Sequence, residues 1–474
     1  MEKGKTNAAL GSFAKKLDAY FGITASGSSL KTELIAGAAT FMTMCYILVV
    51  NAGMIGGTLL GDGGFGAIYI ATALSAIFGT LMLGLFAKLP FAQAPGMGLN
   101  AFFTFSVCLG LGVSYGTALF IVLISGALFF ALSIGGIREK IVEGLPGCIK
   151  LAISAGIGAF IAFIGFQNAK IIVDDPATLV KLVDFTQLFK TGAGQGVALN
   201  AIVCVATFLG IVVMSKKNIK ASIILGLLGG SVLYYLLQLI VFKKISEDLS
   251  LASPFAAFGA FGSKAFFKFE VKGLFTNFKA FMNFVSLVIA FAIVDMFDTI
   301  GTLVGTCTRA GMMDKDGNVP NMRKALISDS AATMVGAVLG TSTVTTYVES
   351  AAGVSAGGRT GFTSVVVAAL FFIAMFLSPI ASLIPGPAAA AALIYVGVLM
   401  MSSVKEIDWH DPAVGACCLM TVLGMPLTYS ISNGIGLGII TYVVVKAVTG
   451  KIKDVKLFTY IIAAIFLLKF FVVG

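Results

Sequence analysis

Three carboxylates fall inside long apolar segments of the sequence. Asp295 and Asp298 stand three residues apart, which places them on one face if their segment is helical, and Glu349 belongs to a separate segment. An ionisable group at membrane depth is costly, and burial or a neighbouring like charge favours the protonated form of a carboxyl. At least one of these groups is therefore expected to bind and release a proton near neutral pH. For either aspartate alone, a hydrogen bond to neighbouring backbone is the alternative.

Other polar side chains in the apolar segments have weaker claims to chemistry. Asn100 can both donate and accept, so it either fixes a planar heterocycle or holds its own turn. Glu33 and Asp329 lie near expected helix starts, where a carboxylate favours the positive end of the helix dipole, and we interpret both as structural. Arg359 sits in a Gly-rich loop and is expected to serve membrane topology.

The cysteines and the single histidine point away from metal chemistry. The cysteines lie singly or as one adjacent pair without metal-ligand spacing, so we interpret them as small apolar residues. They are Cys45, Cys108, Cys148, Cys204, Cys307, Cys417 and Cys418. His410 stands beside Trp409 at an expected membrane boundary and is interpreted as part of an interfacial anchor rather than a proton relay.

The composition indicates that the elements positioning these groups lie in a membrane. Of 474 residues, 58% are hydrophobic and 11% are charged, about half the charged share of a soluble domain. The apolar residues form runs of about 18 to 25, long enough to cross about 30 Å of hydrocarbon. The net charge of +10 is scattered over loops, which favours anionic lipid headgroups over nucleic acid as the partner.

Apolar runs between charged loops predict fourteen transmembrane segments, seven in each half of the chain. An odd count gives the second half the opposite orientation, as an inverted repeat requires. The positive-inside rule places the N-terminus in the cytoplasm. The predicted spans are 33–55, 65–87, 91–110, 114–136, 148–168, 197–214 and 219–242, then 279–303, 323–340, 342–357, 361–384, 387–404, 412–428 and 431–448.

The third predicted span of each half is broken. Residues 94–100 read APGMGLN, in which Pro and Gly disrupt a regular helix, and residues 341–354 begin with a hydroxyl-rich, β-branched stretch. Each segment is expected to form a short extended strand leading into a half-helix. Irregular backbone at membrane depth is tolerated where it lines a wet cavity or is buried in protein, so matched breaks indicate a central binding site. Gly98 and Ser350, from these segments, join the candidate substrate-binding residues; two ordinary kinks are the alternative.

Several long strings of the sequence resemble one transporter family. They are AGAATFMTMCYILVVN, AQAPGMGLNAFF, VDMFDTIGTLVG, GTSTVTTYVESAAGVSAGGRTG and MPLTYSISNGIGLG. They resemble the AzgA-like branch of the nucleobase-cation symporter-2 family, the adenine, guanine and hypoxanthine permeases. The likeness runs from about residue 17 to 450.

The resemblance implies proton-coupled purine uptake by alternating access in the plasma membrane, without a cofactor and with the proton as coupling ion. It implies that Asp295 and Glu349 hold the purine with Asn100 as their partner, and that Asp298 couples the proton. It also suggests a homodimer. Each protomer would have a core domain (31–136 and 279–385) and a gate domain (137–242 and 386–450). The remaining parts would be a cytoplasmic segment (1–30), an external connection (243–278) and a C-terminal apolar helix (451–474).

Other functions remain as alternatives. Uracil and xanthine carriers of the same family have a Glu and a His in the span that here carries Asp295 and Asp298, which favours a purine carrier. An anion exchanger of this fold would need a basic or purely dipolar centre, whereas this centre is acidic. An intramembrane aspartyl protease commonly takes its two carboxylates from different helices, so an enzyme is not expected. A channel is open on physical grounds alone and is separated from a carrier by saturable, gradient-driven uptake.

Overall fold

The computed structural model describes residues 14–135, 146–190, 192–244, 253–313, 319–468 and 470–471. The start of the predicted cytoplasmic segment, the predicted boundary near residue 136 and part of the 243–278 connection lie outside these residues. In the element labels, α marks an α-helix, η a short π- or 3-10 helix and β a strand. The first half of the described chain is mainly helical. Its elements are α2 (Leu30–Met44), α3 (Ile47–Asn51), η1 (Ala52–Gly57), α4 (Gly64–Leu81), η2 (Met82–Ala87), β1 (Gln93–Pro95), α5 (Met97–Ala101), η3 (Phe102–Gly110), α6 (Tyr115–Ile134), α8 (Gly147–Asn168), β2 (Ile172–Asp175), β3 (Leu179–Leu182), η4 (Phe185–Phe189), α9 (Ala193–Lys216) and α10 (Ser222–Phe242).

The second half of the described chain is also mainly helical, with one strand among the helices. Its elements are α11 (Pro254–Ala260), η5 (Phe261–Ala265), α12 (Phe278–Ala310), α13 (Met322–Leu339), β4 (Val344–Thr346), α14 (Ser350–Ser355), α15 (Gly361–Ala374), η6 (Met375–Leu377), α16 (Ser378–Ala381), α17 (Gly386–Met401), η7 (Ser402–Glu406), α18 (Pro412–Leu427), α19 (Ile431–Val448), η8 (Ile452–Asp454) and α20 (Leu457–Leu468).

Local capping explains where several of these helices begin. Side chains of Ser29, Ser114, Thr360 and Asp411 each accept a hydrogen bond from a backbone N–H in the first turn of α2, α6, α15 and α18. Such caps satisfy donors that the helix itself leaves unpaired. Pro412 occupies the first turn of α18, where its missing N–H costs nothing.

Ten helices in the described part of the chain are long and apolar enough to cross a membrane. The expected fourteen segments are therefore matched only in part by that criterion. The predicted spans at 91–110 and 342–357 each hold a short strand followed by helix, and α18 is an apolar helix of 16 residues. α12 extends past its predicted end at residue 303 to Ala310.

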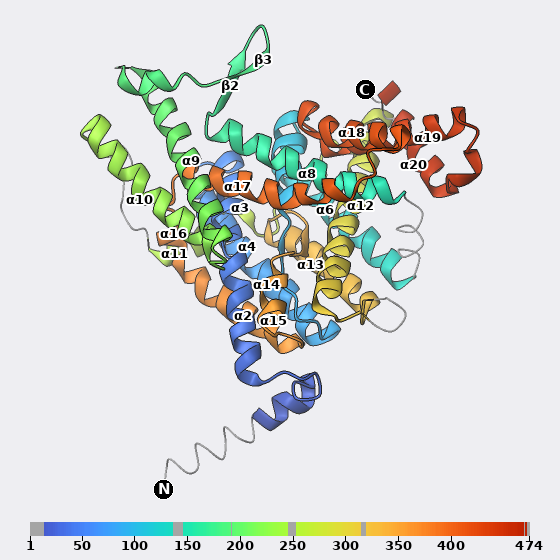
Figure 1. The fold of residues 1–474 in the computed structure, drawn as a ribbon, viewed down its shortest axis with the longest axis horizontal. Coiled ribbons are helices and arrows are strands. Elements are labelled where there is room, and N and C mark those ends of the chain that lie inside the picture. Colours follow the sequence, from blue (N-terminus) through green and yellow to red (C-terminus); the bar gives the residue numbers. More distant parts are fainter. Residues whose placement is uncertain are drawn as a thin grey trace.

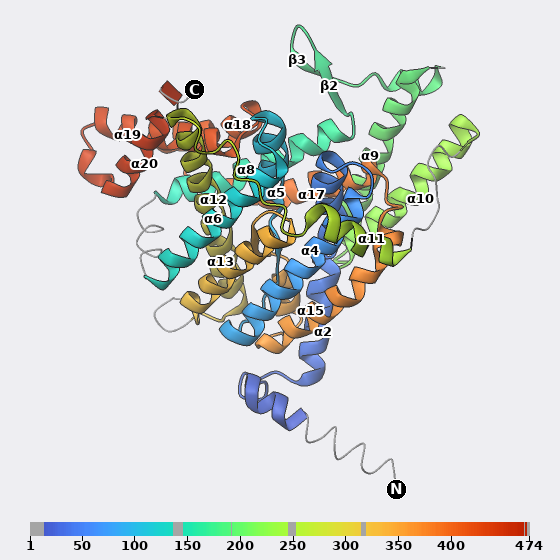
Figure 2. The same cartoon turned by 180° about the vertical axis from the view of Figure 1, so that it is seen from behind.

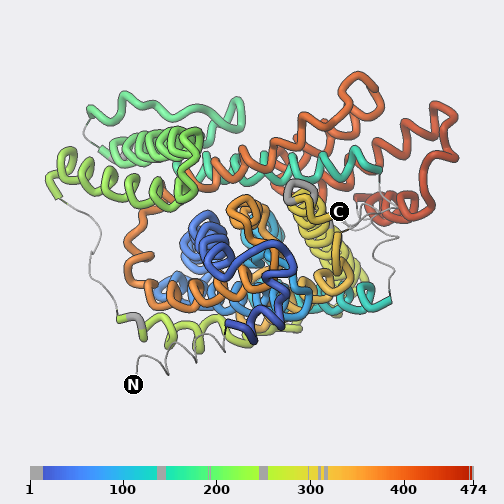
Figure 3. The backbone as a smooth tube through the Cα atoms, turned by 60° about the horizontal axis from the view of Figure 1, so that its bottom comes forward, coloured from blue at the N-terminus to red at the C-terminus, as the bar shows by residue number. Residues whose placement is uncertain are grey.

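The helices pack in two groups drawn from both halves of the sequence. α8 packs on α17 and α18, α9 packs on α10 and α17, and α18 packs on α19. In Figure 3 these green, teal and orange-red segments lie along one side of the molecule. The other group has α15 against α2 and α4, and α13 against α4 and α6; Figure 2 shows α4, α13 and α15 together.

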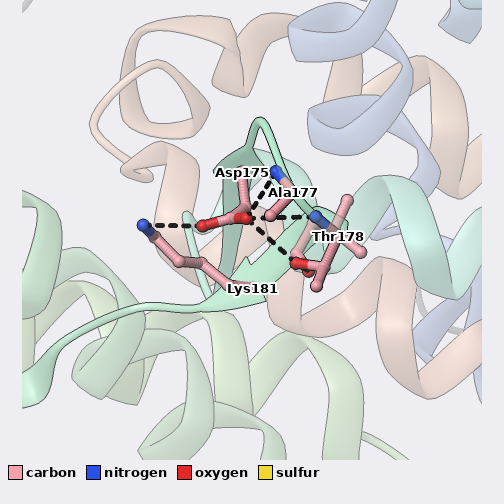
Figure 4. A network of polar contacts seen from close by, with 5 residues as sticks. Asp175, Ala177, Thr178 and Lys181 are labelled. Atoms are coloured by element: carbon pink, nitrogen blue, oxygen red, sulfur yellow. Dashed lines mark hydrogen bonds and ion pairs between the residues drawn. The ribbon is translucent and has the colours of Figure 1, made fainter.

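A β-hairpin interrupts the helices where an all-α fold was expected. β2 and β3 pair antiparallel, from Ile172 opposite Leu182 to Asp175 opposite Leu179, and project beyond the helices in Figure 1. The Asp175 carboxylate forms a salt bridge of 2.9 Å with Lys181 Nζ and accepts hydrogen bonds from the N–H groups of Ala177 and Thr178 (Figure 4). The Lys181 contact, helped by these N–H groups, lowers the pKa of the partly exposed Asp175 to about 2.

Candidate functional site

The two broken segments meet each other in the interior. β1 and β4 pair antiparallel, with Gln93 opposite Thr346 and Pro95 opposite Val344, and every residue of both strands is buried. α5 begins two residues after β1, and α14 begins four residues after β4. Because the strands run in opposite directions, the two half-helices start from opposite ends of this short ladder. The prediction of a strand and half-helix in each segment is confirmed.

α12 lies against this strand pair and brings both of its aspartates to it. Thr345 Oγ1, in the middle of β4, donates to Asp298 Oδ2 at 3.1 Å. Asp295 lies one turn before Asp298 on α12, and its Oδ2 accepts a hydrogen bond of 3.1 Å from Thr333 Oγ1 of α13. Asp295 is buried and Asp298 partly exposed, so the two carboxylates of one helix face have different surroundings.

Glu349 stands at the N-terminal boundary of α14 and is half-buried. It accepts a hydrogen bond of 2.7 Å from the hydroxyl of Tyr46, which lies at the break between α2 and α3. Tyr46 itself is buried. Sequence reasoning missed Tyr46, because one tyrosine in an apolar run carries no signal until α2 is placed beside α14.

Asn100 and Ser350 are both engaged by neighbouring backbone or hydroxyl groups. The Asn100 side-chain amide donates a hydrogen bond of 3.2 Å to the carbonyl of Pro95, which holds its own turn. Its oxygen accepts a hydrogen bond from Ser342, which links this turn to the second broken segment. Ser350 Oγ accepts from the N–H of Ala92 at 3.0 Å, which fastens α14 beside β1. For Asn100, the structure shows the hydrogen bond of the turn-holding alternative.

At Gly98, α5 and α8 approach each other closely. A Cβ added to Gly98 would lie 2.3 Å from Cγ2 of Ile157 in α8, inside any permitted contact. Gly96, on the other side of Met97, would place a Cβ 3.5 Å from Asp298 Oδ2. Gly98 therefore admits α8 to the start of α5, and the tightest contacts of a Cβ at Gly96 would be with Thr345, at 3.0 and 3.1 Å.

A pair of aromatic rings borders the same region. Phe102 follows α5 and Phe291 lies one turn before Asp295 on α12, with their ring centroids 4.9 Å apart. Both side chains are buried. The sequence offers forty phenylalanines and gave no basis for choosing among them.

Two carboxylates interpreted as structural make bonds between segments. Glu33 accepts from the N–H groups of Arg359 and Thr363, at 3.0 and 3.2 Å, and so anchors the start of α15 rather than of its own helix. Asp329 lies in the second turn of α13 and accepts from Thr299 Oγ1 at 2.6 Å and Gln93 Nε2 at 3.1 Å. Asp329 therefore ties α12 and β1 to α13.

A family model described as Permease family, named for xanthine and uracil permeases, matches residues 31–437. The chain belongs to this permease family. It is 42% identical to a putative permease of Methanocaldococcus jannaschii over 96% of this chain and 98% of the relative. It is 36% identical to an adenine permease of Escherichia coli (96% and 95% covered) and 38% identical to a guanine/hypoxanthine permease of Bacillus subtilis (94% and 98% covered).

This permease shares its fold with a solved transporter. The transmembrane domain of the cyanobacterial bicarbonate transporter BicA superposes with a TM-score of 0.56, covering 92% of this chain and 97% of that domain, at 14% identity. The likeness shows the fold alone. The protein is thus an integral membrane permease and not an enzyme, and the resemblance to the purine permeases is confirmed.

Proposed function

We propose that this permease carries purine nucleobases into the cell together with protons, by alternating access. The observation that carries the proposal is the acidic site around the β1–β4 pair, where Asp298 accepts from Thr345 of β4, Asp295 accepts from Thr333 of α13, and Glu349 stands at the N-terminal boundary of α14. Relatives named as adenine and guanine/hypoxanthine permeases over nearly the full length support the purine.

The groups at this site suit a purine chemically. A purine offers ring N–H donors, which a carboxylate accepts, and ring nitrogen or carbonyl acceptors, which backbone N–H groups satisfy, all in one plane. In the proposal Glu349 and Asp295 receive the ring donors, and the backbone at Gly98 and Ser350 faces the ring acceptors. Asn100 sets the turn that presents this backbone. In the proposal Phe102 or Phe291, which contact each other beside this region, supplies the aromatic ring that meets a ring face.

Asp298 is the proposed proton-coupling group. It contacts the strand pair through Thr345 while Glu349 stands at the N-terminal boundary of α14, so a proton on Asp298 removes one of the three carboxylate charges of the proposed site. Proton binding and purine binding are then favourable to each other. This is the linkage that a symporter requires.

The proposed movement uses the two groups of helices. The group holding β1, β4 and α12 would act as the core and the group holding α8, α17 and α18 as the gate, arranged as a fourteen-segment inverted repeat with a cytoplasmic N-terminus in the plasma membrane. The close contact of Gly98 with Ile157 is where the groups would slide or rock.

Competition for uptake among nucleobases tests which solute the permease transports. Uptake of labelled hypoxanthine into proteoliposomes should saturate and should be reduced by adenine or guanine but not by uracil, xanthine or bicarbonate. Competition by uracil and xanthine, without competition by adenine or guanine, would transfer the function to a uracil/xanthine carrier. Bicarbonate-dependent exchange without nucleobase uptake would make it an anion exchanger.

A further inference from the structure

Three thiols from two helices gather in the group that holds α8 and α18. Cys148 is the second residue of α8, and Cys417 and Cys418 are adjacent in α18. Their sulfur atoms all lie within 4.8 Å of one another, and Cys148 Sγ is 4.0 Å from Cys417 Sγ. We call these residues the thiol triad. None of them takes part in the proposed purine site.

The 4.0 Å between Cys148 Sγ and Cys417 Sγ is close to the spacing of sulfurs that share one metal ion and too long for a disulfide bond. Three thiolates at about 2.3 Å from one ion stand about 3.8 Å apart in tetrahedral geometry and about 4.0 Å apart in a trigonal plane. A disulfide requires sulfurs at about 2.05 Å. We propose that the thiol triad binds one soft d10 metal ion of the Zn²⁺ or Cu⁺ class between α8 and α18.

The surroundings favour thiolates and allow an ion to enter. Cys148 lies in the first turn of the 22-residue helix α8, where the positive end of the helix dipole stabilises a thiolate. Cys148 is partly exposed, whereas Cys417 and Cys418 are fully buried. An ion can therefore reach the triad from the side of Cys148 and be held by the two buried sulfurs.

Binding of the metal ion requires no change in oxidation state. A Zn²⁺ ion displaces the three thiol protons to solvent and forms three Zn–S bonds, which leaves a net charge of minus one beside the N-terminus of α8. Sulfur ligands select soft ions over Mg²⁺ and Ca²⁺, which prefer oxygen. The bound ion would fasten the beginning of α8, the helix whose Ile157 contacts Gly98, to α18.

Metal titration of the purified full-length protein tests the triad. After chelator treatment under reducing conditions, the wild type should bind one Zn²⁺ per chain, and Co²⁺ in its place should give a thiolate charge-transfer band. Cys148→Ser and Cys418→Ala should each weaken binding by at least about tenfold and abolish the band. Cys204→Ser, a buried cysteine of α9, is the matched control and should bind as wild type does.

The same experiment can overturn the proposal. Unchanged Zn²⁺ affinity in both triad variants, each eluting as a monodisperse peak, would remove the triad as the site. Lack of stoichiometric binding by the wild type would do the same. A Cys148–Cys417 disulfide in protein purified without reductant would replace the metal site with a redox pair.

Discussion

Glu349 is the residue on which the proposed purine contact depends most. Glu349→Gln keeps the size of the side chain and an oxygen that accepts from Tyr46, but it removes the charge that receives a purine N–H. A hydrogen bond to a charged group contributes about 1.5–3 kcal/mol, so we expect hypoxanthine uptake to fall about tenfold or more. Labelled uptake in cells measures this, with the exposed Glu406→Gln as matched control. Wild-type uptake by Glu349→Gln would contradict the site.

Substitution of Asp298 should abolish proton coupling while leaving hypoxanthine binding in place. Asp298→Asn keeps an acceptor for Thr345 Oγ1 but cannot take up a proton, so binding of hypoxanthine should survive while accumulation no longer increases when the external pH is lowered. Binding to purified protein and uptake across a series of external pH values measure the two properties. Acid-stimulated accumulation by Asp298→Asn would remove Asp298 from the coupling role.

Substitution of Asp329 should lower the stability of the folded protein. Asp329→Ala removes the buried acceptor of Thr299 Oγ1 and one acceptor of Gln93 Nε2, which should destabilise the protein by about 1–3 kcal/mol, the cost of leaving a buried donor unsatisfied. Thermal unfolding in detergent measures this. Exposed Asp62→Ala is the control. An unchanged unfolding temperature in Asp329→Ala would show that these bonds do not hold α13 to β1.

At the scale of elements, the contact between α5 and α8 makes a separate prediction. Gly98→Ala places a methyl group against Ile157 and should slow transport several-fold, because the two groups of helices can no longer approach. Ile157→Ala in the same chain removes the clash and should restore much of the rate. Gly53→Ala, which meets no neighbouring atom, is the control. Failure of Ile157→Ala to rescue uptake would place the defect elsewhere.

The sequence predicted the broken elements but not their partners. Pro95, the neighbouring glycines and the β-branched threonines of 341–346 have local effects on backbone, so the strand and half-helix pairs could be anticipated. The register of β1 on β4 joins residues about 250 positions apart and is set by tertiary packing. The β2–β3 hairpin was missed because its short strands lie in a polar connection between apolar runs.

The same limit applies to side chains brought together from distant segments. Asp295, Asp298 and Glu349 stood out because a charge in an apolar run is costly wherever it is placed. Tyr46 and the thiol triad did not, because tyrosine and cysteine are ordinary in such runs and Cys148 is 269 residues from Cys417. Their roles are visible only after α2 is set against α14 and α8 against α18.

At the scale of the whole molecule, two groups of helices meet at one acidic site. The strand pair, α12 and α14 present carboxylates, while α8 closes on the glycine at the start of α5. A carrier built this way should couple the movement of one group to the occupancy and protonation of the site. Proton movement and purine movement are then parts of one cycle.

Proton flow driven by purine alone tests this claim most directly. Proteoliposomes holding a trapped pH dye, with equal pH on both sides, receive hypoxanthine on the outside. The proposal predicts acidification of the interior that depends on hypoxanthine, is absent with uracil and is lost in Asp298→Asn. Hypoxanthine entry at the wild-type rate with no change in internal pH would contradict proton symport.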